Sequence, residues 1–301
     1  MSTSLNTVTG KNKTANSHPE PDLADFEPDN KVIYKDGNYY YAKKYKNGKK
    51  WKKFSEFEEL LNVFSKTLSV NAYRPKVEKM DPKKETGRES KFGGTKPFFV
   101  KGEKWPTDVK WDYKTSKNGP TYYMTFFGQF IDPRKKDKML YRIFILIDDN
   151  DINDRYWITK IELNEENLKN QIIIEKPKYP EGFFDKYSKE EKFEPYKITG
   201  WTKFKELGSF DMIRTFFHIN PYKYGDDNTL YNGLQKAFYD HDLAPAGGVK
   251  VGGTPLSTQD QDFVQNYDLI QIEETSYLPY MWGDAGIAHV SEDLEFTWDC
   301  C

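Results

Sequence analysis

The sequence predicts an α+β fold dominated by antiparallel sheets, in which a small βββα unit precedes a larger domain. Apolar, strand-like runs follow one another without regular helices between them, which favours antiparallel pairing. Aromatic residues make up 16% of the chain, and disordered chains are poor in them. A Gly-Gly element occurs at Gly93-Gly94 and again at Gly252-Gly253. Each copy is followed by a proline and then by an apolar strand with a glutamine, which indicates two degenerate related halves.

The N-terminal region divides into a tail and a small unit. Residues 1–30 are polar and have no hydrophobic period, so we expect a disordered tail. Residues 31–72 contain Asp36-Gly37 and Asn47-Gly48 between aromatic β-formers, the pattern of two successive hairpins. A capping box at Ser55 and Glu58 then begins a helix, whose apolar stripe is Phe57, Leu60, Leu61, Phe64 and Leu68.

The remainder is predicted to be a linker and the main domain. Residues 73–89 are rich in Lys, Glu and Pro and are expected to be a linker, so the domain covers 90–301. Residues 176–200 resemble a long loop or insertion, and residues 230–240 a helix with Leu230, Leu234, Ala237 and Phe238 on one face. The expected strands are 122–127, 139–147, 158–163, 171–175, 249–251, 269–272 and 287–290.

Bulk properties exclude several classes of protein. A net charge of −2 gives no global reason to bind nucleic acid. No apolar run is long enough to cross a membrane, and the N-terminus lacks a secretory signal. The two cysteines, Cys300 and Cys301, exclude a disulfide framework and are expected to be small packed thiols. We therefore expect a cytoplasmic or other intracellular location, a viral particle included, and no membrane partner.

The sequence contains no recognisable catalytic motif. The nucleophile elbow and the phosphate- and dinucleotide-binding loops are absent, and the four histidines lack metal-ligand spacing. We therefore predict no catalytic residue, no metal and no cofactor. One alternative is an enzyme with a cleft around Asp284, assisted by Gln271 and His241. The competing interpretation of Asp284 is a side chain that caps its own turn. Gln129 and Gln271 either line a pocket or pair with the backbone.

The predicted meander is strongly basic. Nine lysines and one acidic residue lie between Lys31 and Lys53. Lysines interleaved with aromatic rings suit phosphate contacts and base stacking. Alternatively, they are a solvated face whose charges protect the sheet edges, and the acidic tail is able to mask the patch. The candidate nucleic-acid contacts are Lys43, Lys44, Lys49, Lys50, Trp51, Lys52 and Lys53.

Residues 90–301 resemble the YwqG-like family of uncharacterised proteins. The resemblance rests on Ser90-Lys-Phe-Gly-Gly94 with Pro97, Phe127-Gly-Gln-Phe130, Val251-Gly-Gly-Thr-Pro255, and the closing Trp282-Gly-Asp-Ala-Gly286. It implies two related sheet-containing halves and, because some members lie beside toxin genes, an immunity role. The family has no established activity to transfer. The signature residues, for a ligand or for structure, are Gly93, Gly94, Gln129, Gly252, Gly253, Gln271, Trp282, Gly283, Asp284 and Gly286.

Residues 31–70 are similar, more weakly, to the small arm-binding domain of tyrosine recombinases, which implies contact with DNA. Three functions follow in order of preference. The first is a non-enzymatic protein that binds a protein partner, as an immunity-like protein or an assembly component. The second is a nucleic-acid-associated protein that acts through the basic meander. The third is the enzyme with a cleft around Asp284.

Overall fold

A computed structural model gives the fold as two compact units, residues 1–68 with 210–243 and residues 69–209 with 244–301. Each unit is described separately. The large unit thus begins about twenty residues earlier than expected, and residues 210–243 belong with the small unit. The structure describes residues 31–35, 38–54, 59–62, 69–112, 117–146, 155–178, 193–206, 216–218, 226–240, 246–258, 269–280, 282 and 284–300.

The small unit contains the predicted three-stranded meander. Strands β1 (Val32–Lys35), β2 (Asn38–Tyr45) and β3 (Gly48–Phe54) pair antiparallel in chain order. Helix α4 (Asp226–Asp240) contacts β1, and its predicted apolar face of Leu230, Leu234, Ala237 and Phe238 is buried. Residues 59–62 are helical, with Leu60 and Leu61 buried, and the rest of the helix expected over 55–68 lies outside the described residues.

The large unit is built on one antiparallel sheet of ten strands, so the chain is mostly β with few helices. Its order is β11-β10-β9-β5-β13-β4-β14-β15-β16-β17. The strands are β4 (Val70–Lys79), β5 (Lys91–Phe92), β9 (Thr125–Ile131), β10 (Met139–Leu146), β11 (Arg155–Glu162), β13 (Tyr196–Glu206), β14 (Lys250–Gly252), β15 (Ile270–Glu273), β16 (Ile287–Val290) and β17 (Phe296–Asp299).

Two small sheets and two short helices complete the described part of this unit. Strand β6 (Phe99–Val100) pairs with β12 (Gln171–Ile172), and β7 (Thr107–Asp112) pairs with β8 (Lys117–Tyr123). The helices are η2 (Pro82–Lys84) and α2 (Glu165–Lys169). Among the residues that the structure describes, no helix is long and apolar enough to cross a membrane.

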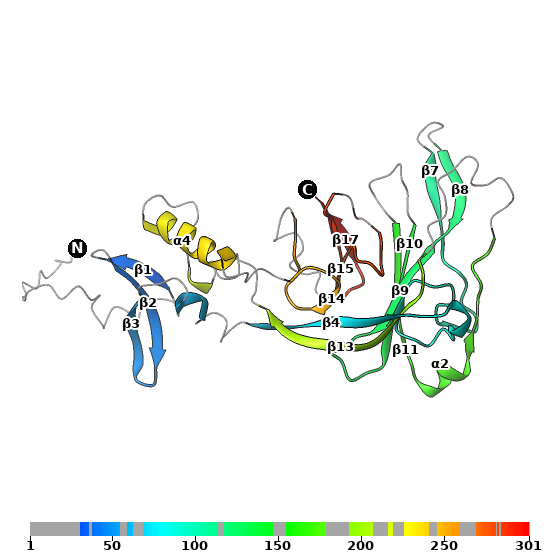
Figure 1. Ribbon diagram of the computed structural model, residues 1–301, viewed down its shortest axis with the longest axis horizontal. Coiled ribbons are helices and arrows are strands. Elements are labelled where there is room, and N and C mark those ends of the chain that lie inside the picture. Colours follow the sequence, from blue (N-terminus) through cyan, green and yellow to red (C-terminus); the bar gives the residue numbers. More distant parts are fainter. Residues whose placement is uncertain are drawn as a thin grey trace, which may run out of the picture. The chain divides into compact units, whose positions relative to one another are not determined.

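The centre of the large sheet is a long ribbon made by β4 and β13, which lie side by side in Figure 1. Strand β13 continues the sheet through β5, β9, β10 and β11, and β4 continues it through β14, β15, β16 and β17. Five strands therefore lie on each side of the boundary between β4 and β13. Each ribbon strand leads into the opposite side, because β4 pairs with β14 but is followed by β5, and β13 pairs with β5 but is followed by β14.

The prediction of a linker over residues 73–89 is wrong, because most of β4 falls within it. This strand was not predicted because it contains Pro75 and several charged residues, which are unusual in a central strand. A proline is excluded from central strands because it cannot donate to the ladder. Strand β4 tolerates Pro75 because β14 pairs only with Ala72 and Tyr73, which leaves β4 with one strand neighbour from residue 74 onward. Strand β13 was missed likewise, since its first residues lie in the expected loop 176–200.

Aromatic side chains fill the core of the large unit. Phe127 packs edge-on against Phe193, Tyr280 and Trp282, with ring centroids 5.3 to 6.4 Å apart. The edge strands β11 and β17 also approach each other, because the ring of Tyr156 lies 5.0 Å from that of Phe296. The sheet is therefore curled strongly enough to bring its two edges into side-chain contact.

Candidate functional site

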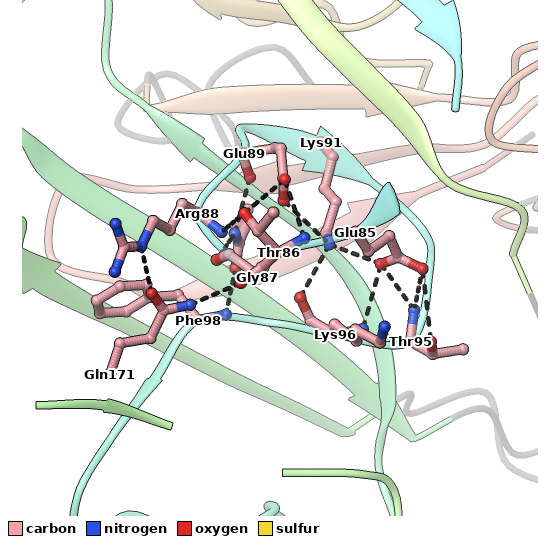
Figure 2. A network of polar contacts seen from close by, with 11 residues as sticks. Glu85, Thr86, Gly87, Arg88, Glu89, Lys91, Thr95, Lys96, Phe98 and Gln171 are labelled. Carbon is pink, nitrogen blue, oxygen red and sulfur yellow. Dashed lines mark hydrogen bonds and ion pairs between the residues drawn. The ribbon is translucent and has the colours of Figure 1, made fainter. Parts of the chain in front are cut away.

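The first Gly-Gly element surrounds a buried lysine (Figure 2). Lys91 on β5 is fully buried, and its ammonium donates to Glu85 at 2.6 Å and to the Lys96 carbonyl at 2.8 Å. Glu85 also accepts from the backbone N–H groups of Thr95 and Lys96, at 3.1 and 3.2 Å. Gly94 has φ +88°, and a Cβ there would lie 2.4 Å from the Glu85 carboxylate. The glycine is therefore required for the backbone to close around the ion pair.

The second Gly-Gly element forms the same arrangement in the other half of the large sheet, beyond the central pair of strands β4 and β13. Lys250 on β14 is fully buried and donates to Glu206 at 2.8 Å and to the Thr254 carbonyl at 2.7 Å. Glu206 accepts from the N–H groups of Thr254 and Ala246, at 2.6 and 3.0 Å. Gly253 has φ +83°, and a Cβ there would lie 2.1 Å from Glu206. Burial lowers the pKa of Lys250, and the Glu206 carboxylate opposes that shift.

The two strand glutamines hold the loops that precede these lysines. Gln129 accepts from the Phe98 N–H at 2.9 Å and donates to the carbonyls of Gly87 and Glu89. Gln271 accepts from the Leu256 N–H at 2.8 Å and donates to the carbonyls of Ala246 and Gly248 at 3.2 and 3.1 Å. In both cases the carbonyls that accept from the glutamine amide belong to the residues four and two positions before the buried lysine. Each glutamine uses both amide protons and its carbonyl on the backbone, so neither presents its amide to a ligand.

The two halves of the large sheet differ at the residue that lies opposite each glutamine on the next strand, β10 beside Gln129 and β16 beside Gln271. Arg142, opposite Gln129, donates to both carboxylate oxygens of Glu103 at 2.8 and 3.0 Å and to the Phe98 carbonyl at 2.7 Å. Burial alone would raise the pKa of Glu103, but the hydrogen bonds from Arg142 and from Val100 hold it below its usual value. The position opposite Gln271 is His289, which is fully buried and lies 3.6 Å from Asp299.

Sequence reasoning missed these buried charges, because Lys, Glu and Arg are seldom buried unless paired. A signal was nevertheless present. Lys91-Phe-Gly-Gly-Thr95 and Lys250-Val-Gly-Gly-Thr254 place a lysine and a threonine at the same distances from Gly-Gly. Both lysines are enclosed by protein acceptors and have no exposed surface. They therefore stabilise the backbone and are inaccessible to a substrate.

The closing signature is an exposed turn beside a buried glycine. Asp284 and Ala285 are exposed, whereas Trp282 and Gly286 are buried. Gly283 lies outside the described residues. A shallow depression of about 430 Å³ lies beside the turn. Its lining residues are Glu273, Glu274, Thr275, Ser276, Pro279, Ala285 and Gly286.

The residues named for the enzyme alternative are Asp284, Gln271 and His241. The amide of Gln271 is held by the backbone, Asp284 is exposed on its turn, and His241 lies outside the described residues. Within the described ranges, no group of three His, Cys, Asp or Glu side chains is placed to hold a metal ion.

The basic meander presents lysines on both faces of the β2–β3 hairpin. Lys43 lies directly opposite Lys50, and Lys44 directly opposite Lys49. Successive strand residues point to opposite faces, so one lysine pair lies on each face. Strand β1 pairs only with residues 38–41, so the hairpin continues beyond the end of β1. Lys43, Lys44 and Lys50 are exposed there, and so is Tyr45, the last residue of β2.

The base of the hairpin differs from its end. Lys52 forms an ion pair with Glu59 at 3.4 Å and lies over the Tyr41 ring. The electrostatic interaction with the phenolic oxygen of Tyr41, which is negative when ionised, raises the pKa of Lys52. The hydrogen bond and the charge of Glu59 raise it further. Trp51 is half-buried and Lys53 is exposed. The candidate nucleic-acid contacts therefore divide into an exposed lysine end and a base that belongs partly to the small unit's own packing.

Comparison with known proteins adds no identification. A scan against protein-family models found no match, and a search of curated proteins found none either. The resemblance to the YwqG-like family stays a prediction.

Proposed function

We propose that this is a binding protein whose small unit contacts nucleic acid through the exposed end of the β2–β3 hairpin. The observation that carries the proposal is the register of β2 and β3, which places Lys43 directly opposite Lys50 and Lys44 directly opposite Lys49. Like charges directly opposite each other destabilise a sheet. An anionic partner removes that repulsion. Lysines that neutralise the phosphates of a nucleic acid also release the counterions condensed on it, which favours binding.

The distribution of lysines over two faces favours a duplex over a flat anionic surface. A flat surface contacts one face of a ribbon, which would leave the second lysine pair in water. The major groove of a duplex admits a two-stranded ribbon and has phosphates along both walls. One pair on each face therefore matches a partner with charge on two sides.

Replacement of Lys43, Lys44, Lys49 and Lys50 by glutamine should abolish most duplex binding. Four phosphate contacts give a slope of about −4 for log affinity against log salt, and the variant should lose this slope. Fluorescence anisotropy of a labelled DNA duplex measures both quantities. The matched control replaces four exposed lysines of the large unit, Lys101, Lys104, Lys197 and Lys205.

The alternative role of these lysines, protection of the sheet edges, predicts a different result. The quadruple variant would then bind DNA as the wild type does and would self-associate, which light scattering detects. Equal loss of binding in the control variant would show that only the net charge matters. Either result contradicts the proposal.

We infer a second function, a protein-binding scaffold, for the large unit. The matched contacts around Lys91 and Lys250 support the view that its two sides are copies of one ancestral unit. The observation that favours a protein partner is edge strand β11, which pairs with β10 alone among the described strands and whose Tyr156 remains 40% exposed although its ring contacts that of Phe296 on β17. Edge strands accept an added strand from a partner, with side-chain pockets for specificity.

Substitution Tyr156→Lys should remove a protein partner that the wild-type chain retains. A charged side chain on an edge strand opposes the addition of another strand. Affinity capture from the native lysate, treated with nuclease and read by mass spectrometry, compares the two proteins. The control Lys160→Gln changes an exposed residue on the same strand and the same face. A partner captured equally by wild type and Tyr156→Lys would refute the β11 surface.

A further inference from the structure

We propose that Tyr45 is a stacking platform for an unpaired base, so that the β2–β3 hairpin prefers a DNA duplex that contains one. Tyr45 is the last residue of β2 and adjoins the turn formed by Lys46 and Asn47. The inference rests on the proposed nucleic-acid function and specifies which form of nucleic acid the same site prefers.

The ring of Tyr45 is open to solvent, unlike the other rings of its strand. Tyr45 is 44% exposed, and it is the only exposed large hydrophobic side chain in the described part of the small unit. Tyr40 and Tyr41 are buried, and Tyr39 stacks on Phe54. Packing within the small unit therefore explains these three tyrosines but not Tyr45. An exposed ring among basic side chains is the arrangement with which proteins stack the bases of single-stranded nucleic acid.

The neighbours of Tyr45 leave room for a flat ligand and place charge beside it. Tyr45 lies opposite Gly48, which has no side chain to cover the ring from the adjacent strand. The Lys43 ammonium lies over the ring, 5.5 Å from its centroid, and Lys43 lies opposite Lys50. Because alternate residues of a strand share a face, Tyr45, Lys43 and Lys50 are on one face of the hairpin. A base stacked on the ring would therefore have two ammonium groups near its flanking phosphates.

The cost of unstacking decides which bases the ring is able to bind. A base within a duplex must be unpaired and unstacked before it reaches the ring, and this cost is comparable with or larger than the gain from one stacking contact. A base that is already unpaired avoids most of the cost. Tyr45 therefore favours a duplex with an unpaired nucleotide over a fully paired one, whereas the lysines contact the phosphates of both.

One unpaired thymine should raise the affinity of the full chain for a duplex about tenfold. Fluorescence anisotropy compares two labelled DNA duplexes that are identical except for one extra, unpaired thymine in one strand. Tyr45→Ala should bind both duplexes with about the wild-type affinity for the paired one, whereas Tyr45→Phe keeps the ring and should keep the preference. The matched control is Tyr156→Ala, which removes an exposed tyrosine of the large unit and should also keep the preference.

The preference should persist when salt is raised. An increase from about 50 to about 200 mM salt should weaken the binding of both duplexes, because phosphate contacts depend on counterion release. The ratio of the two affinities should stay about constant, because stacking on a neutral ring releases no counterions. A ratio that falls to one at the higher salt would assign the preference to the lysines and overturn the role of Tyr45.

The outcomes separate this inference from the proposed function. Equal wild-type affinity for the two duplexes, with binding that depends on the hairpin lysines, would overturn the inference and leave the function standing. A preference that survives in Tyr45→Ala would also overturn the inference, because another residue would then contact the unpaired base. Failure of the wild type to bind either duplex would overturn the function and the inference with it. Tyr45→Leu keeps an apolar side chain but has no ring, so it should behave as Tyr45→Ala does and replaces that variant if alanine disturbs the hairpin.

Discussion

Substitution Glu206→Gln should cost about 3 to 5 kcal/mol of the large unit's unfolding free energy, the usual penalty for removing one partner of a buried ion pair. Glutamine is nearly the same size, so the change removes charge and little volume. It leaves the Lys250 ammonium, which has no exposed surface, without the carboxylate that contacts it directly. The other ligand of that ammonium is the carbonyl of Thr254, which is not an ion. Urea unfolding, followed by tryptophan fluorescence, measures the loss.

The matched control is Glu194→Gln. Glu194 is paired with Lys79 at 2.5 Å, but both side chains are more than 60% exposed. Exposed ion pairs contribute about 0 to 1 kcal/mol, so this control should be nearly neutral. The equivalent change in the other half, Glu85→Gln, should cost less than Glu206→Gln, because Lys91, although also fully buried, keeps Glu89 at 3.8 Å as a second carboxylate. A loss below about 1 kcal/mol in Glu206→Gln would show that Lys250 is accommodated without a charged partner.

Substitution Gly286→Ala should destabilise the large unit by about 3 kcal/mol, the upper end of the usual cost of overpacking. A Cβ at this position would lie 1.6 Å from the Trp282 carbonyl oxygen and 3.0 Å from that of Asp299. Both obstructions are backbone atoms, so the turn and β17 would have to move. The same unfolding measurement applies.

The neighbouring residue provides the control. Ala285 has φ +51°, a conformation that glycine adopts without penalty. Ala285→Gly should therefore leave stability unchanged or raise it by up to about 1 kcal/mol. The exposed Asp284 should accept Asn within about 0.5 kcal/mol. A folded, stable Gly286→Ala protein would mean that the signature is not a packing requirement, and attention would return to a ligand at this turn.

Sequence patterns predicted the elements whose local chemistry agrees with their surroundings. The apolar run that became β10 is buried along nearly its whole length, and the apolar stripe of α4 faces inward. The hairpin predicted at Asn47-Gly48 formed with Lys46 and Asn47 in the turn and with Gly48 opposite Tyr45. In these segments propensity, hydrophobic pattern and turn chemistry all favour one structure.

The misses share one cause, namely partners that are distant in the sequence. Strand β4 has a weak pattern of its own and is held by β13, which follows it by more than a hundred residues. Lys91 and Lys250 are buried only because Glu85 and Glu206 approach them from other segments. A single sequence shows the lysine and the carboxylate but not their pairing, so the buried ion pairs could not be predicted from it.

The long pairing between β4 and β13 also has a consequence for the chain as it leaves the ribosome. Strand β4 is synthesised well before its main partner exists, and synthesis adds about 5 to 20 residues per second. During that delay β4 is an open strand able to pair with a neighbouring nascent chain. Pro75 and the exposed Lys76 and Lys79 discourage such pairing. The proline and lysines that made β4 hard to predict therefore protect it from pairing with other chains until β13 has been synthesised.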